Sequence, residues 1–146
     1  MSATLNLYDQ DFFAWTQEQA KFIKEKSFDK LDLIHLFEEV ESMGNQNKTE
    51  LRNRLSILLM HLLKWKYQPE FKGKSWFLTI VQQRSDISDL ISDNPSLKHF
   101  LPLIFEKAYL KAVTFASAET GIKKNAFPKE SEWDIEQVLD EEFYPN

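Results

Sequence analysis

Hydrophobic residues recur at helical spacing along most of the chain, while no alternation typical of a β-strand extends far enough to count. In the segment 32–43, Leu33, Leu36, Phe37 and Val40 occupy the i, i+3, i+4 and i+7 positions of one helix face. The pattern therefore predicts helices throughout. The expected helices cover about 11–26, 32–43, 46–66, 75–93, 96–121 and 131–139.

Glycine, proline and capping residues set the expected boundaries of these helices. Gly44 is expected to end the second helix and to begin a hairpin. Pro69 and Gly73 mark a loop, because proline lacks an amide donor and glycine relaxes the backbone. Ser75 and Ser131 are expected to cap the helices that follow them.

The third helix is the most apolar and is expected to lie at the centre of the fold. Leucines at positions 51, 55, 58, 59, 62 and 63 form one stripe, and Ile57 and Met60 add apolar surface on the opposite side. The connections between the expected helices are short, which favours antiparallel neighbours. The sequence predicts an all-α fold, an antiparallel bundle of five or six helices in a single domain spanning residues 1–146.

The composition suits one globular domain and excludes several kinds of site. The chain has 146 residues, of which 42% are hydrophobic and 28% are charged. It contains no cysteine, which excludes disulfides, cysteine-ligated zinc, iron–sulfur clusters and thiol nucleophiles. Its three glycines are too far apart to form a dinucleotide-binding motif or a P-loop. We expect no cofactor.

The sequence carries no signal for secretion or for a membrane span. Residues 1–11 have neither the basic nor the apolar region of a signal peptide. The longest uncharged apolar stretch, from Leu55 to Leu63, is well short of the ~20 residues that a bilayer span needs. We expect a soluble, cytoplasmic protein with no membrane partner.

The net charge of −5 is unevenly distributed along the chain. Residues 1–47 contain four Lys or Arg and nine Asp or Glu, residues 48–84 contain eight and two, and residues 85–146 contain six and twelve. A basic middle segment therefore lies between two acidic flanks. Either the flanks fold against the middle segment and neutralise it, or that segment binds an anion.

Several charged or amide side chains fall inside the apolar arcs of the expected helices. A buried charge must be paired or must change its protonation state, because its desolvation is costly. Glu119 lies in the last turn before Gly121, where the helix dipole disfavours a carboxylate, so it needs a cation such as an arginine. We hypothesise one buried polar network that either fixes helix register or carries function. Its members are Glu41, Arg52, Gln83, Arg84 and Glu119.

An enzymatic role has less support, because no nucleophile and no metal centre can be identified. One carboxylate of the network could act as a general acid or base, but no catalytic residue can be assigned. The three histidines, His35, His61 and His99, lie on three different expected helices. Asp32-x-x-His35 is the only near match to the ligand spacing of di-iron helices, so we expect no metal site.

The basic middle segment interleaves cations with aromatic rings around the expected loop at Pro69. Cations that hold phosphates beside aromatic rings that stack on bases are typical of proteins that bind single-stranded nucleic acid. Alternatively, the rings belong to the core and the lysines are solvated. The candidate ligand or nucleic-acid surface comprises His61, Lys64, Trp65, Lys66, Tyr67, Gln68, Lys72, Lys74 and Trp76.

Short motifs over nearly the whole chain resemble a known family. They are Tyr8-Asp9-x-Asp11-Phe12-x-x-Trp15, Glu38-Glu39-Val40-Glu41-Ser42-Met43-Gly44, His61-Leu62-Leu63-Lys64-Trp65-x-Tyr67-Gln68-Pro69, Ser75-Trp76-x-x-Thr79-Ile80-x-x-Gln83-Arg84, Glu119-Thr120-Gly121, Phe127-Pro128 and Leu139-Asp140. On these motifs the chain resembles the bacterial domain-of-unknown-function family twenty-nine, which is common in cyanobacteria. The resemblance implies an all-helical fold, a cytoplasmic bacterial protein and no established activity. Relatives often have a small residue or cysteine where this chain has Glu132, which argues against a cysteine-based role here.

The sequence is compatible with three functions. The first is a non-catalytic interaction module that binds a protein partner, or itself, through exposed parts of its aromatic-rich helices. The second is a nucleic-acid-associated protein that uses the basic segment 48–84, with binding that weakens in salt. The third is a small hydrolase or nuclease that would need an open pocket around its acid–base groups. Those groups are Glu41, His61, Arg84 and Glu119.

Overall fold

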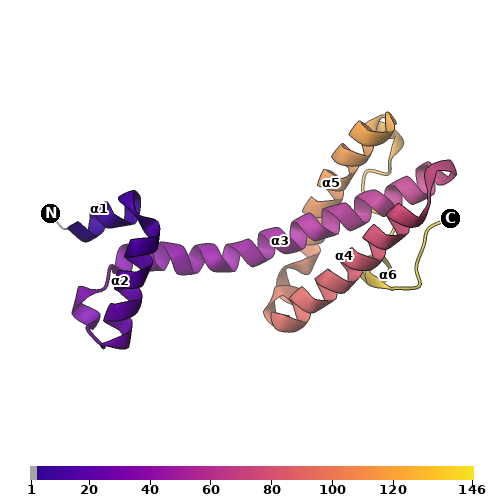
Figure 1. Ribbon diagram of the computed structural model, residues 1–146. Coiled ribbons are helices and arrows are strands. Elements are labelled where there is room, and N and C mark those ends of the chain that lie inside the picture. The colour runs from indigo at the N-terminus through magenta and orange to yellow at the C-terminus, as the bar shows by residue number, and fades with distance from the viewer. Residues whose placement is uncertain (1–2) are drawn as a thin grey trace. The chain divides into compact units, whose positions relative to one another are not determined.

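The computed structural model describes residues 3–146, and within that range it contains six α-helices and no β-strand (Figure 1). The all-α prediction is confirmed. The α-helices are α1 Ala3–Gln10, α2 Phe12–Lys24, α3 Leu33–Tyr67, α4 Lys74–Asp93, α5 Leu101–Thr120 and α6 Ile135–Leu139. Short 3-10 helices are η1 Phe28–Lys30, η2 Pro69–Phe71, η3 Pro95–Phe100 and η4 Lys124–Ala126.

The contacts within the chain divide it into two compact units, Met1–Asn45 and Gln46–Asn146. The first unit contains α1, α2, η1 and the beginning of α3, and the second contains the rest of α3 and all later elements. Each unit has buried side chains of its own. The expectation of one domain over residues 1–146 stays a prediction.

Helix α3 differs most from the expected pattern, because it continues through Gly44. The expected end at Gly44 and the expected hairpin there are wrong. A glycine ends a helix when it adopts a left-handed conformation, and Gly44 has no positive φ angle. A glycine in the interior of a helix costs only about 1 kcal/mol, which the surrounding helical residues can offset. Gly121 does adopt the left-handed conformation, with φ 79°, and ends α5 as expected.

The residues that cap the remaining helices differ in part from those that the sequence predicted. Asp11 caps α2, since its carboxylate accepts a hydrogen bond from the backbone N–H of Ala14 at 3.0 Å. Ser75 does not cap α4, which begins one residue earlier after Gly73. Ser131 does not cap α6 either. That helix begins with a capping box, in which Asp134 and Gln137 satisfy each other's backbone N–H groups.

The core of the second unit is formed by the apolar stripe of α3, as the leucine pattern predicted. Its side chains at Leu51, Leu55, Leu58, Leu59 and Leu62 are completely buried. They pack with isoleucines of α4, with the small side chains of α5 and with apolar residues of the C-terminal segment. The partners in this core include Ile80, Ile87, Ala108, Ala112, Ala116, Phe127, Trp133 and Val138.

Side-chain contacts give the direction of the helices in the second unit. Arg54 of α3 contacts Asp86 of α4, and Lys64, farther along α3, lies over Trp76 near the start of α4. Helix α4 is therefore antiparallel to α3. Lys64 also contacts Glu119 near the end of α5, so the end of α5 lies beside the C-terminal part of α3 (Figure 1). The C-terminal segment that contains α6 completes this unit.

The first unit buries far less apolar surface. Trp15 of α2 is its one large hydrophobic side chain that is fully buried among the described residues, and Gln19 is buried beside it. The ring of Tyr8 packs edge-on against Trp15 with centroids 4.8 Å apart, and Phe12 stacks on the same indole at 5.6 Å. The family-like motif at residues 8–15 thus forms an aromatic cluster between α1 and α2.

Candidate functional site

The structure does not join the five residues of the predicted buried network. Glu41 is exposed on the part of α3 that belongs to the first unit. Because α3 continues through Gly44, no hairpin folds Glu41 back toward Arg52. Gln83 instead accepts a hydrogen bond from Arg54 at 3.3 Å. The Nε of Arg52 is buried without a hydrogen-bond partner among the described residues.

Arg84 is buried, and its hydrogen-bond partners are backbone carbonyls of the C-terminal segment. Its Nε donates to the carbonyl of Val138 at 2.8 Å, and one terminal nitrogen donates to the carbonyl of Phe143 at 2.7 Å. The other donates to the carbonyl of Glu141 at a longer 3.4 Å. Burial lowers the pKa of Arg84, and Tyr144 and nearby carboxylates act in the opposite direction. Arg84 thus holds the C-terminal segment against α4.

Glu119 has the cationic partner that the helix dipole requires, although it is a lysine. The Nζ of Lys64 donates to Glu119 at 3.1 Å and lies 4.7 Å from the centre of the Trp76 ring. The Lys64 side chain is 9% exposed, whereas that of Glu119 is 53% exposed. This contact fastens three helices together through residues that all lie in the family-like motifs.

His61 lies near this contact but is not held in a catalytic arrangement. Its Nδ1 is 2.8 Å from the carbonyl oxygen of Ile57, one turn earlier in α3. Burial lowers the pKa of His61, the bond to Ile57 raises it, and the charge of Lys64 lowers it further. Of the other residues in the hydrolase hypothesis, Glu41 lies in the first unit, Arg84 donates to the carbonyl of Val138, and Glu119 accepts from Lys64.

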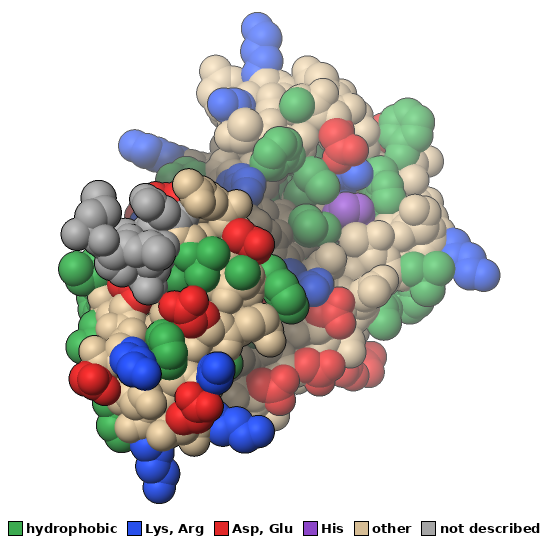
Figure 2. All heavy atoms as spheres, turned by 60° about the vertical axis from the view of Figure 1, so that its left-hand side comes forward, with side chains coloured by type: hydrophobic (Ala, Val, Ile, Leu, Met, Phe, Trp, Pro, Cys, Tyr) green, Lys and Arg blue, Asp and Glu red, His purple; other side chains and the backbone are tan. Residues whose placement is uncertain are grey.

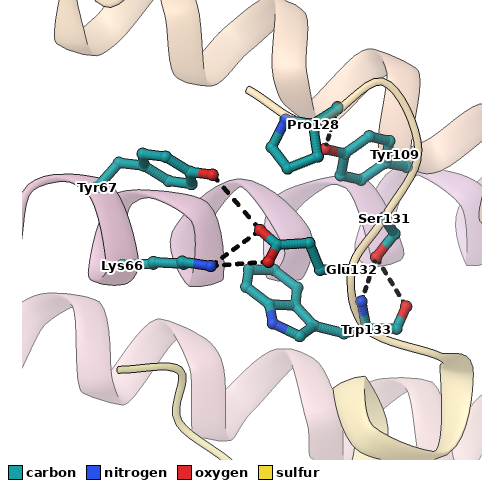
Figure 3. A network of polar contacts seen from close by, with 7 residues as sticks. All are labelled: Lys66, Tyr67, Tyr109, Pro128, Ser131, Glu132 and Trp133. Carbon is teal, nitrogen blue, oxygen red and sulfur yellow. Dashed lines mark hydrogen bonds and ion pairs between the residues drawn. The ribbon is translucent and has the colours of Figure 1, made fainter. Parts of the chain in front are cut away.

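A second cluster joins the end of α3 to the segment before α6 (Figure 3). Lys66 donates to both carboxylate oxygens of Glu132 at 2.9 Å, and the hydroxyl of Tyr67 donates to one of them at 3.4 Å. The bond to Glu132 raises the pKa of Lys66. In the same view, the Tyr109 hydroxyl donates to the carbonyl of Pro128 at 2.6 Å, and burial raises the pKa of Tyr109 to about 12.

These contacts occupy much of the candidate nucleic-acid surface. Lys64 and Lys66 are neutralised by glutamates, and the amide of Gln68 points to the carbonyl of Thr120 at 3.5 Å. Lys72 is exposed and lies 5.2 Å from the centre of the Trp65 ring, and Lys74 is exposed at the start of α4. The rings of Trp65, Tyr67 and Trp76 are partly buried, which leaves little open face for stacking. This geometry favours neutralisation of the basic segment by the acidic flank at residues 85–146.

The first unit contains a polar cluster that the sequence pattern did not identify as a site. Asp32 accepts hydrogen bonds from Nε1 of Trp15 at 3.0 Å and lies 2.7 Å from Nδ1 of His35, while its backbone N–H donates to Gln19 at 2.8 Å. The ring of Tyr8 stacks on His35 with centroids 3.8 Å apart. Asp32-x-x-His35 and the motif that contains Trp15 are both visible in the sequence, but the hydrophobic pattern does not indicate that they contact each other.

The charges of this pair stabilise each other. Burial by itself would raise the pKa of Asp32, but the hydrogen bonds from His35 and Trp15 outweigh it and lower that pKa. The bond to Asp32 raises the pKa of His35, although burial acts against it. The cluster fixes the start of α3 against α2, since Asp32 also accepts from the backbone N–H of His35 at 3.3 Å.

The first unit has an exposed apolar surface on α3. We define the acidic apolar face as Leu33, Ile34, Phe37, Val40 and Met43 together with Glu38 and Glu41. The five apolar side chains are 64–70% exposed. Figure 2, in which the side of the first unit comes forward, shows hydrophobic side chains at the surface among acidic and basic ones. Such a surface on a small unit is typical of an interaction site.

Within residues 3–146, no group of three His, Cys, Asp or Glu side chains is placed to hold a metal ion. In the same range, no helix combines the length and the apolar character that a membrane crossing requires.

The comparisons with known proteins agree with the motifs. A family model described as "Domain of unknown function DUF29" matches residues 7–144. Comparisons with curated proteins and with solved structures gave no match. The match covers both units, from the aromatic cluster at Tyr8 and Trp15 to the C-terminal segment that Arg84 holds. The chain therefore belongs to the DUF29 family of domains of unknown function.

Proposed function

We propose that this protein is a non-catalytic interaction module whose acidic apolar face binds a basic amphipathic helix of another protein. The single observation that carries the proposal is the exposure of Leu33, Ile34, Phe37, Val40 and Met43 on one stretch of α3. Helices present apolar side chains at this spacing when the face packs against another element. An amphipathic partner helix is the kind of ligand that such a surface accepts.

The first unit buries few large apolar side chains. Complete burial of a large aliphatic or aromatic side chain stabilises by about 1.5–3 kcal/mol, and Trp15 alone reaches that state among the large apolar side chains described there. Small units with so little apolar burial are only marginally stable. A partner that covers Phe37 and Val40, which are 64% and 66% exposed, would supply the missing burial.

Charge favours a basic partner over a second copy of the same face. The segment 31–47 contains four carboxylates and no lysine or arginine. Two copies of the acidic apolar face would bring Glu38 and Glu41 close to their own equivalents, and like charges oppose association. A helix with lysines or arginines beside its apolar stripe would attract these carboxylates and increase the rate of association.

The proposal can be tested with a defined probe. A labelled synthetic peptide of leucine and lysine, about five helical turns long, should bind the protein in a saturable anisotropy titration, and its leucine–glutamate counterpart should not. The double variant Phe37→Glu, Val40→Glu distinguishes the cause of binding, because it removes apolar contact and adds negative charge. If the face acts as proposed, binding is lost; if charge alone attracts the peptide, binding becomes tighter.

A matched control comes from η2. Phe71 has the same 64% exposure as Phe37 but lies in the second unit, so Phe71→Glu should leave peptide binding unchanged. Sedimentation of the free protein supplies the other arm. A stable dimer that the Phe37→Glu, Val40→Glu variant dissociates would assign the face to self-association and overturn the proposed partner.

A further inference from the structure

A cavity in the second unit brings together two cations and a hydroxyl over an apolar floor. It has a volume of about 380 Å³ and lies where α4, η3, the start of α5 and the end of α6 meet. Its lining residues are Arg84, Ser88, Ile91, Lys98, Leu101 and Leu139. No carboxylate lines it, although the chain as a whole is acidic. The volume is within the range of small-molecule sites.

Arg84 contributes a buried positive charge to the lining of this cavity. The residue is 4% exposed, and a buried charge is costly unless an opposite charge accompanies it. None of the ion pairs in the described part of the chain includes Arg84. Asp140 and Glu141 are close enough to favour its charged form, but its direct contacts are three carbonyls and the Tyr144 ring, 5.2 Å away.

The guanidinium retains donors for a ligand. An arginine has five N–H groups, and Arg84 uses three of them in hydrogen bonds to residues 138, 141 and 143. One N–H on each terminal nitrogen therefore has no partner among the described residues. Two donors on neighbouring terminal nitrogens match the two oxygens of a carboxylate. Lys98, which is exposed, adds a second positive charge at the same cavity.

We propose that this cavity binds a small carboxylate with an apolar body, such as a medium-chain or aromatic acid. The carboxylate would lie against Arg84 and Lys98, and the hydrocarbon part would cover Ile91, Leu101 and Leu139. The apolar floor is the reason to prefer such a ligand over inorganic phosphate, which would leave three hydrophobic side chains uncovered. This site is separate from the acidic apolar face and does not depend on the function proposed for it.

The test is a calorimetric titration with octanoate as the probe, alongside 1-octanol and inorganic phosphate. Octanoate should bind with a stoichiometry near one. Octanol should bind at least about tenfold more weakly, because it cannot form charge-assisted hydrogen bonds with Arg84. Phosphate should not displace octanoate. Amide shifts on octanoate binding should be concentrated at Ser88, Ile91 and Leu101.

Arg84 also holds the C-terminal segment, so its replacement can unfold the protein, and the decisive variant is Lys98→Glu. Lys98 is exposed, and the change should weaken octanoate binding by about tenfold while the fold is retained. Lys107→Glu on α5 is the matched control, since it is exposed and lies outside the cavity. The proposal is overturned if octanoate does not bind saturably, if octanol or phosphate binds as tightly, or if both lysine variants behave alike.

Discussion

Replacing Arg84 with alanine should lower the free energy of unfolding of the second unit by about 3 kcal/mol. The variant loses two short hydrogen bonds, from Nε to the Val138 carbonyl at 2.8 Å and from a terminal nitrogen to the Phe143 carbonyl at 2.7 Å. Hydrogen bonds that involve a charged group contribute about 1.5 kcal/mol or more each. The third bond, to Glu141 at 3.4 Å, is long and adds little.

Urea denaturation followed by tryptophan fluorescence and far-UV circular dichroism measures this loss. Trp65 is a suitable reporter, because its ring lies 4.9 Å from Tyr144 in the segment that Arg84 holds. Arg84→Lys should fall between the wild type and Arg84→Ala, since an ammonium group cannot make both short bonds in the geometry of a guanidinium.

Gln83→Ala is the control, because Gln83 is the neighbouring residue and its side chain accepts one hydrogen bond, from Arg54 at 3.3 Å. It should cost less than about 1 kcal/mol. If Arg84→Ala is no more destabilising than Gln83→Ala, the assignment of Arg84 as the residue that holds the C-terminal segment is refuted.

Three further predictions concern the Asp32–His35 pair and two glycines. The raised pKa of His35 stabilises the first unit fully below its unfolded value of about 6.5, and this contribution is lost as the pH rises through the folded pKa. The lowered pKa of Asp32 stabilises the first unit fully above its unfolded value of about 3.9, and this contribution is lost as the pH falls through the folded pKa. Protection of α2 amides from exchange should therefore be greatest between these two pH values. An NMR titration that finds an ordinary pKa for His35 would contradict this. Gly44→Ala should stabilise α3 by about 0.5–1 kcal/mol in thermal denaturation, because the added Cβ meets no atom within 4 Å. A loss of helicity in this variant would instead indicate that the helix is interrupted at residue 44. Gly121→Ala should destabilise by about 1 kcal/mol in the same assay, because φ is 79°, and a neutral effect would argue against the left-handed cap.

The sequence predicted the second unit better than the first. The leucine stripe of α3 has a strong helical period and is buried where the pattern indicated, because apolar periodicity and burial have the same cause. The helix boundary predicted at Gly44 is wrong, since a glycine with no neighbouring proline can end a helix or lie inside one. Only its backbone conformation decides, and that depends on residues beyond the local pattern.

For the candidate sites, too, the sequence indicated some residues but not their contacts. The position of Glu119 near the end of its helix predicted a cationic partner and offered Arg52 and Arg84, whereas the structure pairs Glu119 with Lys64. The hydrogen-bond partners of Arg84 are backbone carbonyls, which no sequence pattern identifies. The pattern identified Phe37 and Val40 as part of one helix face but could not show that this face is exposed, because exposed and buried apolar stripes have the same spacing.

We propose the exposed stripe of α3 as the binding surface for a basic helix. Hydrogen–deuterium exchange with and without saturating leucine–lysine peptide tests it most directly, because it reports which backbone amides the ligand protects. We predict slower exchange confined to the part of α3 between Leu33 and Met43 and absent in the Phe37→Glu, Val40→Glu variant. Protection of the basic segment 48–84 instead, or equal protection in the variant, would contradict the claim.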